Sequence, residues 1–308
     1  MSNIDSWFLV LNPNSGTQHF QKSWKRIQEA LFIQNIDFSF YFTQYSKHEI
    51  LLVEDAIQQG YRHIISVGGD GTLHHVVNEI MQQRYKNSSE IKLGVIPMGT
   101  GNDWIKTYGI PKNIEQAIQI IKAEHTDLQD IGMIELEDSS KEYFLNMAGI
   151  GYDGYVVSKL KSSKKLGSIA YVISGLQGLL FYRKSWYAFL IDGNKREEKC
   201  LMILFGICKY SGGGVQMTKN PNPKNGLLDI TLVKKISFFD LVLNLPKLYN
   251  GKIVYHKKVE NFKSTSLKII EKSENKSFIE ADGELIGIGS LEVSVMPKAI
   301  QIIVKRTT

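Results

Sequence analysis

The residues most able to bind phosphate lie in a glycine-rich turn, GGDGT, at Gly68–Thr72. Glycines let a backbone approach phosphate oxygens closely, and a helix that follows such a turn directs its N-terminal amides at the same place. Asp70 would repel phosphate, so its carboxylate is expected to hold Mg²⁺, directly or through water, or to order the turn. A structural turn capped by Asp70 is the alternative.

Two further turns carry similar chemistry. In PMGTGND, at Pro97–Asp103, the hydroxyl of Thr100 can donate to a phosphate or nucleotide, and Asp103 adds a second carboxylate. A helix start capped by Asn102 or Asp103 is the alternative there. NPNSG, at Asn12–Gly16, is a weaker signal, because Asn-Pro and Ser-Gly are common turn dipeptides.

The elements that must position these turns are apolar runs alternating with helical patterns, which is typical of a parallel α/β sheet. The expected strands are Trp7–Leu11, Asp37–Thr43, His63–Val67 and Lys92–Pro97, and the expected helices are Trp24–Ile33, Glu49–Gln59, Leu73–Met81 and Ile114–Ala123. Each of the three turns follows an expected strand. Ligands of open α/β sheets bind where strands end, so we expect all three turns to line one site.

After Leu128 the pattern changes to strands joined by polar turns, with a hairpin signal at Asp192. The expected strands are Asp130–Leu136, Tyr143–Met147, Trp186–Ile191, Cys200–Ile207, Leu227–Val233, Lys268–Lys272, Ser277–Ala281 and Leu291–Pro297. We therefore expect an α/β domain over 1–128, with 297–308 as a candidate to complete it. A β-rich domain over 129–296 would follow, with a cleft between the two.

The 308 residues carry a formal net charge of +6, and the positive charge is concentrated. Between Val156 and Asn225 there are twelve Lys or Arg against three acidic residues. Such a face can serve an anionic membrane, nucleic acid or simple solubility, so charge alone does not decide. Cys200 and Cys208 are too few for a disulfide scaffold or a zinc site, and we expect buried, reduced thiols in a cytosolic protein.

The longest run without charge lies between Lys165 and Arg183. It is near the lower length limit for spanning a bilayer, about 17–18 residues, and glycine and polar side chains dilute it. We expect a buried or interfacial helix over Leu166–Tyr182, either a wall of an acyl pocket or plain core packing. The N-terminus shows no signal-peptide pattern.

Taken together, NPNSG, VGGDGTLHHVVNEI and IPMGTGNDWIKTYGIP resemble, in order and spacing, the bacterial diacylglycerol kinase and sphingosine kinase-like family. The resemblance continues through YSGGGVQMTKNPNPKNGLLDI and ADGE. It implies an α/β plus all-β fold, with a Rossmann-like domain related to phosphofructokinases and NAD kinases before a β-sandwich. It also implies an ATP- and Mg²⁺-dependent kinase for diacylglycerol or a related lipid. That enzyme would be cytoplasmic and peripheral at the inner, anionic membrane face, without a nucleic-acid partner.

Carried over motif by motif, the resemblance also assigns site residues. The nucleotide contacts would be Asn12, Pro13, Asn14, Ser15, Gly16, Thr43, Gly69, Asp70, Gly71, Thr72, Leu73, His74, His75, Thr100 and Asp103. The family's general base falls on Glu284, in the Asp282–Glu284 motif, and Asp70 is the second catalytic residue. By sequence alone, Asp-Gly-Glu between strands is usually a hairpin turn.

Two departures from the family pattern matter. His74 and His75 stand where relatives commonly have Asn-Glu, and these histidines could also be surface residues. Asn225 replaces an Asp that, in the family, binds a structural Mg²⁺ together with main-chain carbonyls, here those of Asn222 and Leu227. An amide oxygen supplies no charge, so the affinity for Mg²⁺ should fall.

Two other functions remain open from the sequence. An NAD kinase also has GGDGT, although the other two turns and the basic second half count against it. A lipid- or nucleotide-binding protein without catalysis would explain the departures from the family pattern. The intact Asp70, Asp103 and Glu284 count against that second alternative.

Overall fold

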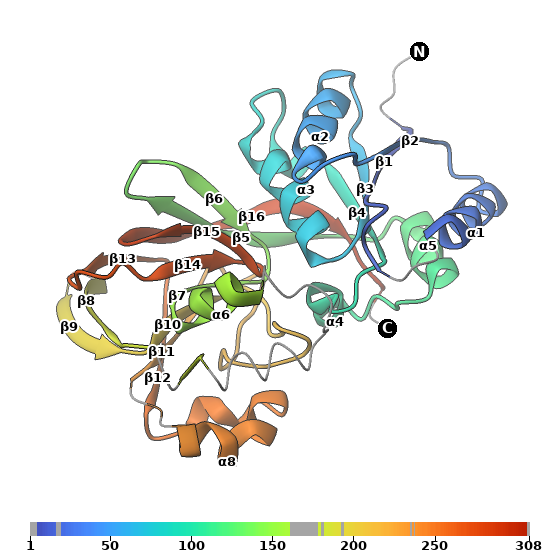
Figure 1. Cartoon of the computed structure of the whole chain (residues 1–308). Coiled ribbons are helices and arrows are strands. Elements are labelled where there is room, and N and C mark those ends of the chain that lie inside the picture. The colour runs from blue at the N-terminus through green and yellow to red at the C-terminus, as the bar shows by residue number, and fades with distance from the viewer. Residues whose placement is uncertain are drawn as a thin grey trace. The chain divides into compact units, whose positions relative to one another are not determined.

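The structure is a computed structural model that describes residues 5–16, 20–160, 178–179, 182–191, 194–234, 236 and 238–306. The chain divides into two compact units (Figure 1). Unit 1 comprises Met1–Asp130 and Lys298–Thr308, and unit 2 comprises Ile131–Pro297.

Unit 1 contains a parallel sheet with the order β2-β1-β3-β4-β16. Its strands are β1 (Trp7–Leu11), β2 (Phe38–Phe42), β3 (His63–Gly68), β4 (Lys92–Pro97) and the end of β16 (Leu291–Ile303). β1 and β3 are buried along their whole length. Continuous apolar runs of this kind are typical of parallel strands that helices cover on both faces.

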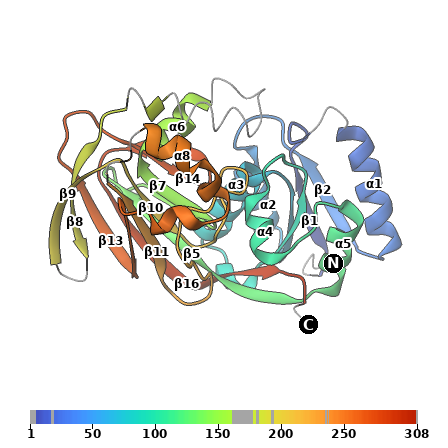
Figure 2. The same cartoon turned by 90° about the horizontal axis from the view of Figure 1, so that it is seen from below.

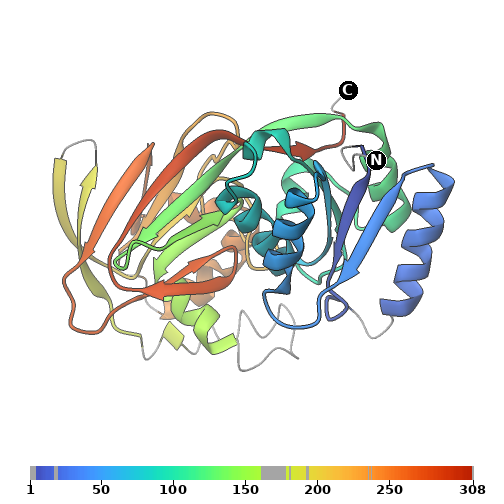
Figure 3. The same ribbon diagram turned by 90° about the horizontal axis from the view of Figure 1, so that it is seen from above.

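The helices of unit 1 are α1 (Phe20–Ile33), α2 (His48–Gln58), α3 (Asp70–Gln82), α4 (Asp103–Tyr108) and α5 (Ile114–Ala123), with a short 3₁₀ turn, η1 (Ser88–Glu90). α1 and α5 pack against each other (Figure 2), and α1 lies beside β1 and β2 (Figure 3). Leu9, Ile27, Leu31 and Ile118 belong to one buried cluster. Leu9 lies on β1, whereas Ile27, Leu31 and Ile118 are apolar positions of the helical patterns of α1 and α5, so the amphipathic faces predict the packing.

Unit 2 is a β-sandwich of antiparallel strands. One sheet has the order β12-β11-β10-β7-β14-β15, and in the other β9, β8, β13 and β16 pair in sequence, with β5 and β6 attached. The bounds are β5 (Thr126–Leu136), β6 (Lys141–Phe144), β7 (Met147–Gly151), β8 (Ser185–Ile191), β9 (Asn194–Cys200), β10 (Met202–Gly206), β11 (Leu228–Val233), β12 (Val259–Ser264), β13 (Ser266–Glu271), β14 (Phe278–Ala281) and β15 (Glu284–Ile288). The fold class expected from sequence, an α/β unit and a β-sandwich, is confirmed.

Unit 2 also contains elements that the sequence did not predict. These are α6 (Tyr152–Leu160), α8 (Phe238–Tyr249), a 3₁₀ turn, η2 (Lys252–Tyr255), and the strand β12. The predicted helix over Leu166–Tyr182 falls almost wholly outside the described residues. Within the described ranges, no helix has both the length and the apolarity needed to cross a membrane.

One predicted strand is wrong. Tyr143–Met147 is not continuous, because β6 ends at Phe144 and β7 begins at Met147. The backbone amides at this break donate to the carboxylate of Asp282, 135 or more residues away, so they leave the strand ladder. By contrast, β8 and β9 pair from Ser185↔Cys200 to Ile191↔Asn194, which confirms the hairpin, although its two turn residues lie outside the described part.

The two cysteines are as expected. Cys200 and Cys208 are buried, and both thiols are free. Burial raises the pKa of Cys200 to about 12, so this thiol stays protonated and unreactive.

Candidate active site

The three turns meet at the carboxyl ends of the parallel strands of unit 1. The amide of Asn12 donates to the carbonyl of Val67 at 3.0 Å, and the amide of Met98 donates to that of Gly68 at 2.7 Å. Thr43, at the end of β2, is buried beside them and donates its amide to the end of β1. The structure therefore brings together the segments that the sequence assigned to one site.

Glycines allow the turns to approach this closely. Gly16 has φ +90°, and a Cβ there would lie 2.3 Å from the carbonyl oxygen of Met98. A Cβ on Gly99 would lie 2.5 Å from the Cα of Gly69. Both distances are shorter than any real Cβ contact, so a side chain at either position would push the turns apart.

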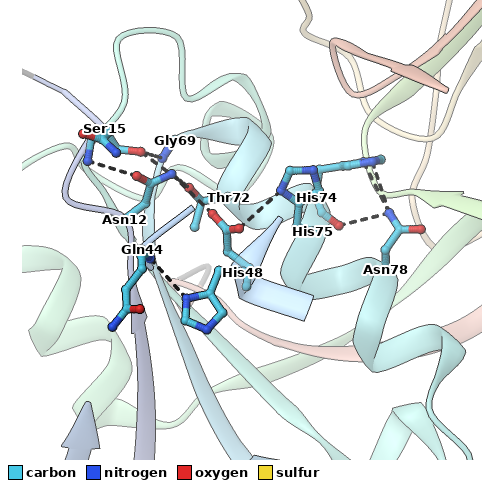
Figure 4. A network of polar contacts seen from close by, with 11 residues as sticks. Asn12, Ser15, Gln44, His48, Gly69, Thr72, His74, His75 and Asn78 are labelled. Carbon is cyan, nitrogen blue, oxygen red and sulfur yellow. Dashed lines mark hydrogen bonds and ion pairs between the residues drawn. The ribbon is translucent and has the colours of Figure 1, made fainter. Parts of the chain in front are cut away.

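Side chains tie the first two turns together (Figure 4). The side-chain amide nitrogen, Nδ2, of Asn12 donates to the hydroxyl of Thr72 at 3.0 Å and to Oε1 of Glu49 at 3.3 Å. The hydroxyl of Ser15 accepts the amide of Gly69 at 3.3 Å and lies 3.5 Å from the hydroxyl of Thr72. The NPNSG and GGDGT turns are thus one hydrogen-bonded unit.

Glu49 is a residue of this network that the sequence did not reveal. Its carboxylate is buried, and Oε2 lies 3.6 Å from Nδ1 of His75 on α3. No motif surrounds Glu49 in the sequence. Its partners come from turns far away in the chain, so only the fold identifies it.

The surface interpretation of the two histidines is wrong. His74 is 1% exposed and His75 is 9% exposed. His75 faces Glu49, whereas the ring of His74 lies within 3.4 Å of the side-chain amide of Asn78, one turn along α3 (Figure 4). His75 therefore supports the network of turns, and His74 packs inside the helix layer.

Asp70 orders the third turn. Its Oδ1 accepts the amide of Asp103, the first residue of α4, at 2.9 Å. The side chain of Asn102 caps no helix and instead donates to the carbonyl of Gly99. Of the roles considered for Asp70, the ordering of a turn is thus visible in the structure.

Two lysines that the sequence did not single out lie at the same turn. Nζ of Lys106 is 2.5 Å from Oδ1 of Asp103. Nζ of Lys112 donates to the carbonyl of Thr100, an exposed residue, at 3.1 Å. Both ammonium groups suit the charge of a phosphate chain.

The start of α3 supplies backbone donors. α3 begins at Asp70 and runs for 13 residues, after Gly69 in an extended conformation. The first amides of a helix have no acceptor within it, and the helix dipole adds partial positive charge there. Gly71, Thr72 and Leu73 therefore belong to a segment suited to anions.

In unit 2, the Asp-Gly-Glu motif is a tight hairpin turn between β14 and β15. Ala281 pairs with Glu284, and the residues between them, Asp282 and Gly283, have φ of +51° and +84°. Two residues with positive φ are typical of a type I′ turn. The carboxylate of Asp282 accepts three backbone amides, those of Leu145 (3.0 Å), Asn146 (3.0 Å) and Met147 (3.1 Å).

A buried carboxyl supports the same turn from below. The amide of Gly283 donates to Oε2 of Glu280 at 2.8 Å. Burial, and after it the nearby carboxylate of Asp153 on α6, raise the pKa of Glu280 well above its usual value. Both effects favour the protonated form of Glu280. Glu284 is half-buried at the start of β15 and directly follows this turn, which the hydrogen bonds of Asp282 and Glu280 stabilise.

The candidate structural Mg²⁺ ligands are weak. The amide of Asn225 lies 3.4 Å from the carbonyl of Asn222, and Oδ1 of Asn225 accepts the amide of Leu227 at 3.1 Å. The three positions supply no carboxylate. In the described part of the chain, no cluster of three or more His, Cys, Asp or Glu could hold a metal ion. These residues do not fit a strong Mg²⁺ site.

Comparison with known proteins identifies the family. Residues 6–134 match the sequence model of the diacylglycerol kinase catalytic domain. Residues 146–304, more than half of the chain, match that of the YegS C-terminal NAD kinase beta sandwich-like domain. The chain belongs to the diacylglycerol kinase family. It is a lipid kinase.

The sequences of relatives align with most of the length of this lipid kinase. A diacylglycerol kinase of Staphylococcus haemolyticus is 28% identical, over 91% of this chain and 82% of its own. A YegS-like protein of Shewanella frigidimarina is 30% identical, over 82% of this chain and 79% of its own. A crystal structure of a diacylglycerol kinase from Bacillus anthracis has a TM-score of 0.73 at 20% identity and covers 99% of this chain and 98% of its own, which shows the shared fold.

Proposed function

We propose that this lipid kinase transfers the γ-phosphate of MgATP to a hydroxyl of diacylglycerol or a related lipid at a membrane surface. The observation that carries the proposal is the joining of three glycine turns into one hydrogen-bonded platform at the start of α3. Such a platform offers backbone amides to a phosphate chain without steric hindrance.

On the nucleotide side, the chain's own residues bind and orient. The first amides of α3 and the hydroxyl of Thr100 would donate to phosphate oxygens, and Lys106 and Lys112 would balance their charge. Asp70 and Asp103 supply carboxylate oxygens, the ligands Mg²⁺ prefers, so they suit the metal that arrives with ATP. Bound there, Mg²⁺ would neutralise charge that develops on the β- and γ-phosphates.

On the lipid side, Glu284 is the proposed general base. It would accept the proton of the lipid hydroxyl as the oxygen attacks the γ-phosphorus and ADP leaves. Phosphoryl transfer depends mainly on positioning, and the hydrogen bonds of Asp282 and Glu280 fix the turn that presents Glu284.

The test is ATP turnover with dioleoylglycerol in mixed vesicles, with labelled phosphate followed into the lipid. Wild type should phosphorylate the lipid, and Glu284→Gln should lower kcat at least 100-fold while binding of ADP stays unchanged. Activity that survives the substitution removes Glu284 as the base. Transfer to NAD in place of lipid would favour an NAD kinase, and nucleotide binding without transfer to either acceptor would favour a non-catalytic binder.

A further inference from the structure

Helix α8 lies at the periphery of unit 2 (Figure 1). It exposes a stripe of large apolar side chains. Phe239 is 76% exposed and Leu243 is 78% exposed, and Val242 between them is exposed as well. Positions 239, 242 and 243 lie on one face of a helix. Tyr255, on the neighbouring η2, adds an exposed ring. We call these four side chains the α8 surface.

The stretch of chain that carries the α8 surface has a net positive charge. From Phe238 to Lys258 the chain contains four lysines and one acidic residue, Asp240, and that residue is paired with Lys258 at 2.5 Å. The other three lysines of this stretch are exposed: Lys247, Lys252 and Lys257. An apolar stripe with amphipathic rings, bordered by lysines, is the chemistry that a membrane interface with anionic headgroups recognises.

The inner side of α8 carries an apolar side chain as well. Leu248 of α8 helps line a cavity of about 40 Å³, together with Ile253 and Val254 from η2 and Met202 and Val233 from the sheet. A helix that faces water on its outer side needs only one apolar face. α8 has apolar side chains on both its inner and its outer side, so exposure to water alone does not explain the apolar residues on the outer side.

We propose that α8 is the element that inserts into the interface of an anionic membrane, with Phe239 and Leu243 below the headgroups. The proposal rests on the proposed function, because a lipid substrate requires that surface, and it names the contact. The basic stretch over 156–225 would then attract the membrane, while α8 anchors the protein to it. Anchoring by buried apolar side chains depends less on salt than attraction by exposed lysines.

The experiment is sedimentation of the full chain with vesicles of phosphatidylcholine and phosphatidylglycerol in equal parts. The variant is Phe239→Ser with Leu243→Ser. Phe32→Ser with Ile33→Ser is the matched control, because those side chains on α1 are 81% and 71% exposed. Loss of two inserted side chains should weaken vesicle binding about 10- to 100-fold. The control should bind like wild type, and vesicles of phosphatidylcholine alone should bind less of every protein.

Activity separates this proposal from the proposed function. With dispersed dioctanoylglycerol, which needs no membrane, the α8 variant should keep the kcat of wild type, which also shows that it is folded. Loss of vesicle binding with kcat retained supports the proposal. Unchanged vesicle binding by the variant, or no binding by wild type, overturns it. If wild type forms a dimer and the variant does not, while both bind vesicles equally, the α8 surface is an interface with a second copy of the chain. That result also overturns the proposal.

A second variant keeps the test decisive if the double substitution fails to fold. Phe239→Trp preserves an apolar ring at the proposed depth. Its emission, after subtraction of the wild-type spectrum, should shift to the blue with the anionic vesicles and be quenched by brominated lipid. An emission that stays at the wavelength of a water-exposed indole overturns the proposal.

Discussion

The Asp-Gly-Glu turn allows stability and catalysis to be separated at two neighbouring carboxylates. Asp282 accepts the amides of Leu145, Asn146 and Met147, whereas Glu284 is the proposed base. Asp282→Asn keeps the size of the side chain and tolerates the positive φ of +51°. It removes the charge and replaces one acceptor oxygen with an NH₂ donor.

The cost follows from the three bonds. Oδ2 accepts the backbone amide of Leu145, and an NH₂ at that position leaves a backbone donor facing another donor, which costs about 1–3 kcal/mol. Oδ1 accepts Asn146 and Met147, and each bond weakens by about 1 kcal/mol when its acceptor becomes neutral. The free energy of unfolding of unit 2 should therefore fall by roughly 3–5 kcal/mol, which lowers Tm by roughly 10 °C.

Glu284→Gln is the matched control. Its side chain is half-buried at the start of β15, and an amide of the same shape should leave the free energy of unfolding within about 0.5 kcal/mol of wild type. Urea unfolding followed by circular dichroism measures stability, and a kinase assay well below both transitions measures activity. If Asp282→Asn unfolds at the same urea concentration as wild type, or if Glu284→Gln is the less stable of the two variants, the assignment of a structural role to Asp282 and a catalytic role to Glu284 is refuted.

Three further predictions concern unit 1. Gly99→Ala places a Cβ 2.5 Å from the facing glycine turn, so KM for ATP should rise about tenfold with KM for lipid unchanged, as steady-state kinetics would show. Glu49→Ala removes a partner of Asn12, so the dissociation constant for ADP, measured by calorimetry, should rise about 3- to 10-fold while kcat falls less. Burial and the charge of Glu54 raise the pKa of Glu79 from 4.5 to about 7, so the folded protein favours the protonated form and loses stability as pH rises from 4.5 to 7. Glu79→Gln should remove that loss, a gain of up to roughly 3 kcal/mol at pH 8 in urea unfolding, and an unchanged pH dependence would contradict the role of Glu79.

The sequence predicted the elements of unit 1 well because local pattern and tertiary structure agree there. Trp7–Leu11 and Lys92–Pro97 are continuous apolar runs ended by turn residues, and both have the predicted bounds. The break between β6 and β7 could not be predicted, because its cause is the carboxylate of Asp282, distant in the chain. The local pattern of apolar and polar residues cannot predict a hydrogen bond from a residue so far away in the sequence.

The candidate site shows the same division. The glycine turns were identified from sequence because their residue types are typical of a tight turn whose backbone approaches a ligand closely. Glu49, Lys106 and Lys112 were missed because a lone charged residue is ordinary until its partners are known. α8 was missed for a related reason: it contains Pro246, and its exposed Phe239 and Leu243 break the usual polar-outside pattern of a surface helix.

The last strand has a consequence for biosynthesis. β16 ends in the parallel sheet of unit 1, where Gln301 and Ile302 pair with the beginning of β4. Nearby, the amide of Lys298 donates to Asp130, and the hydroxyl of Ser88 donates to the carbonyl of Ala299. A ribosome makes these residues after all of unit 2, so unit 1 cannot complete its sheet until the whole of unit 2 has been synthesised. Nascent chains that stop early would leave the edge of β4 open to pairing with other molecules.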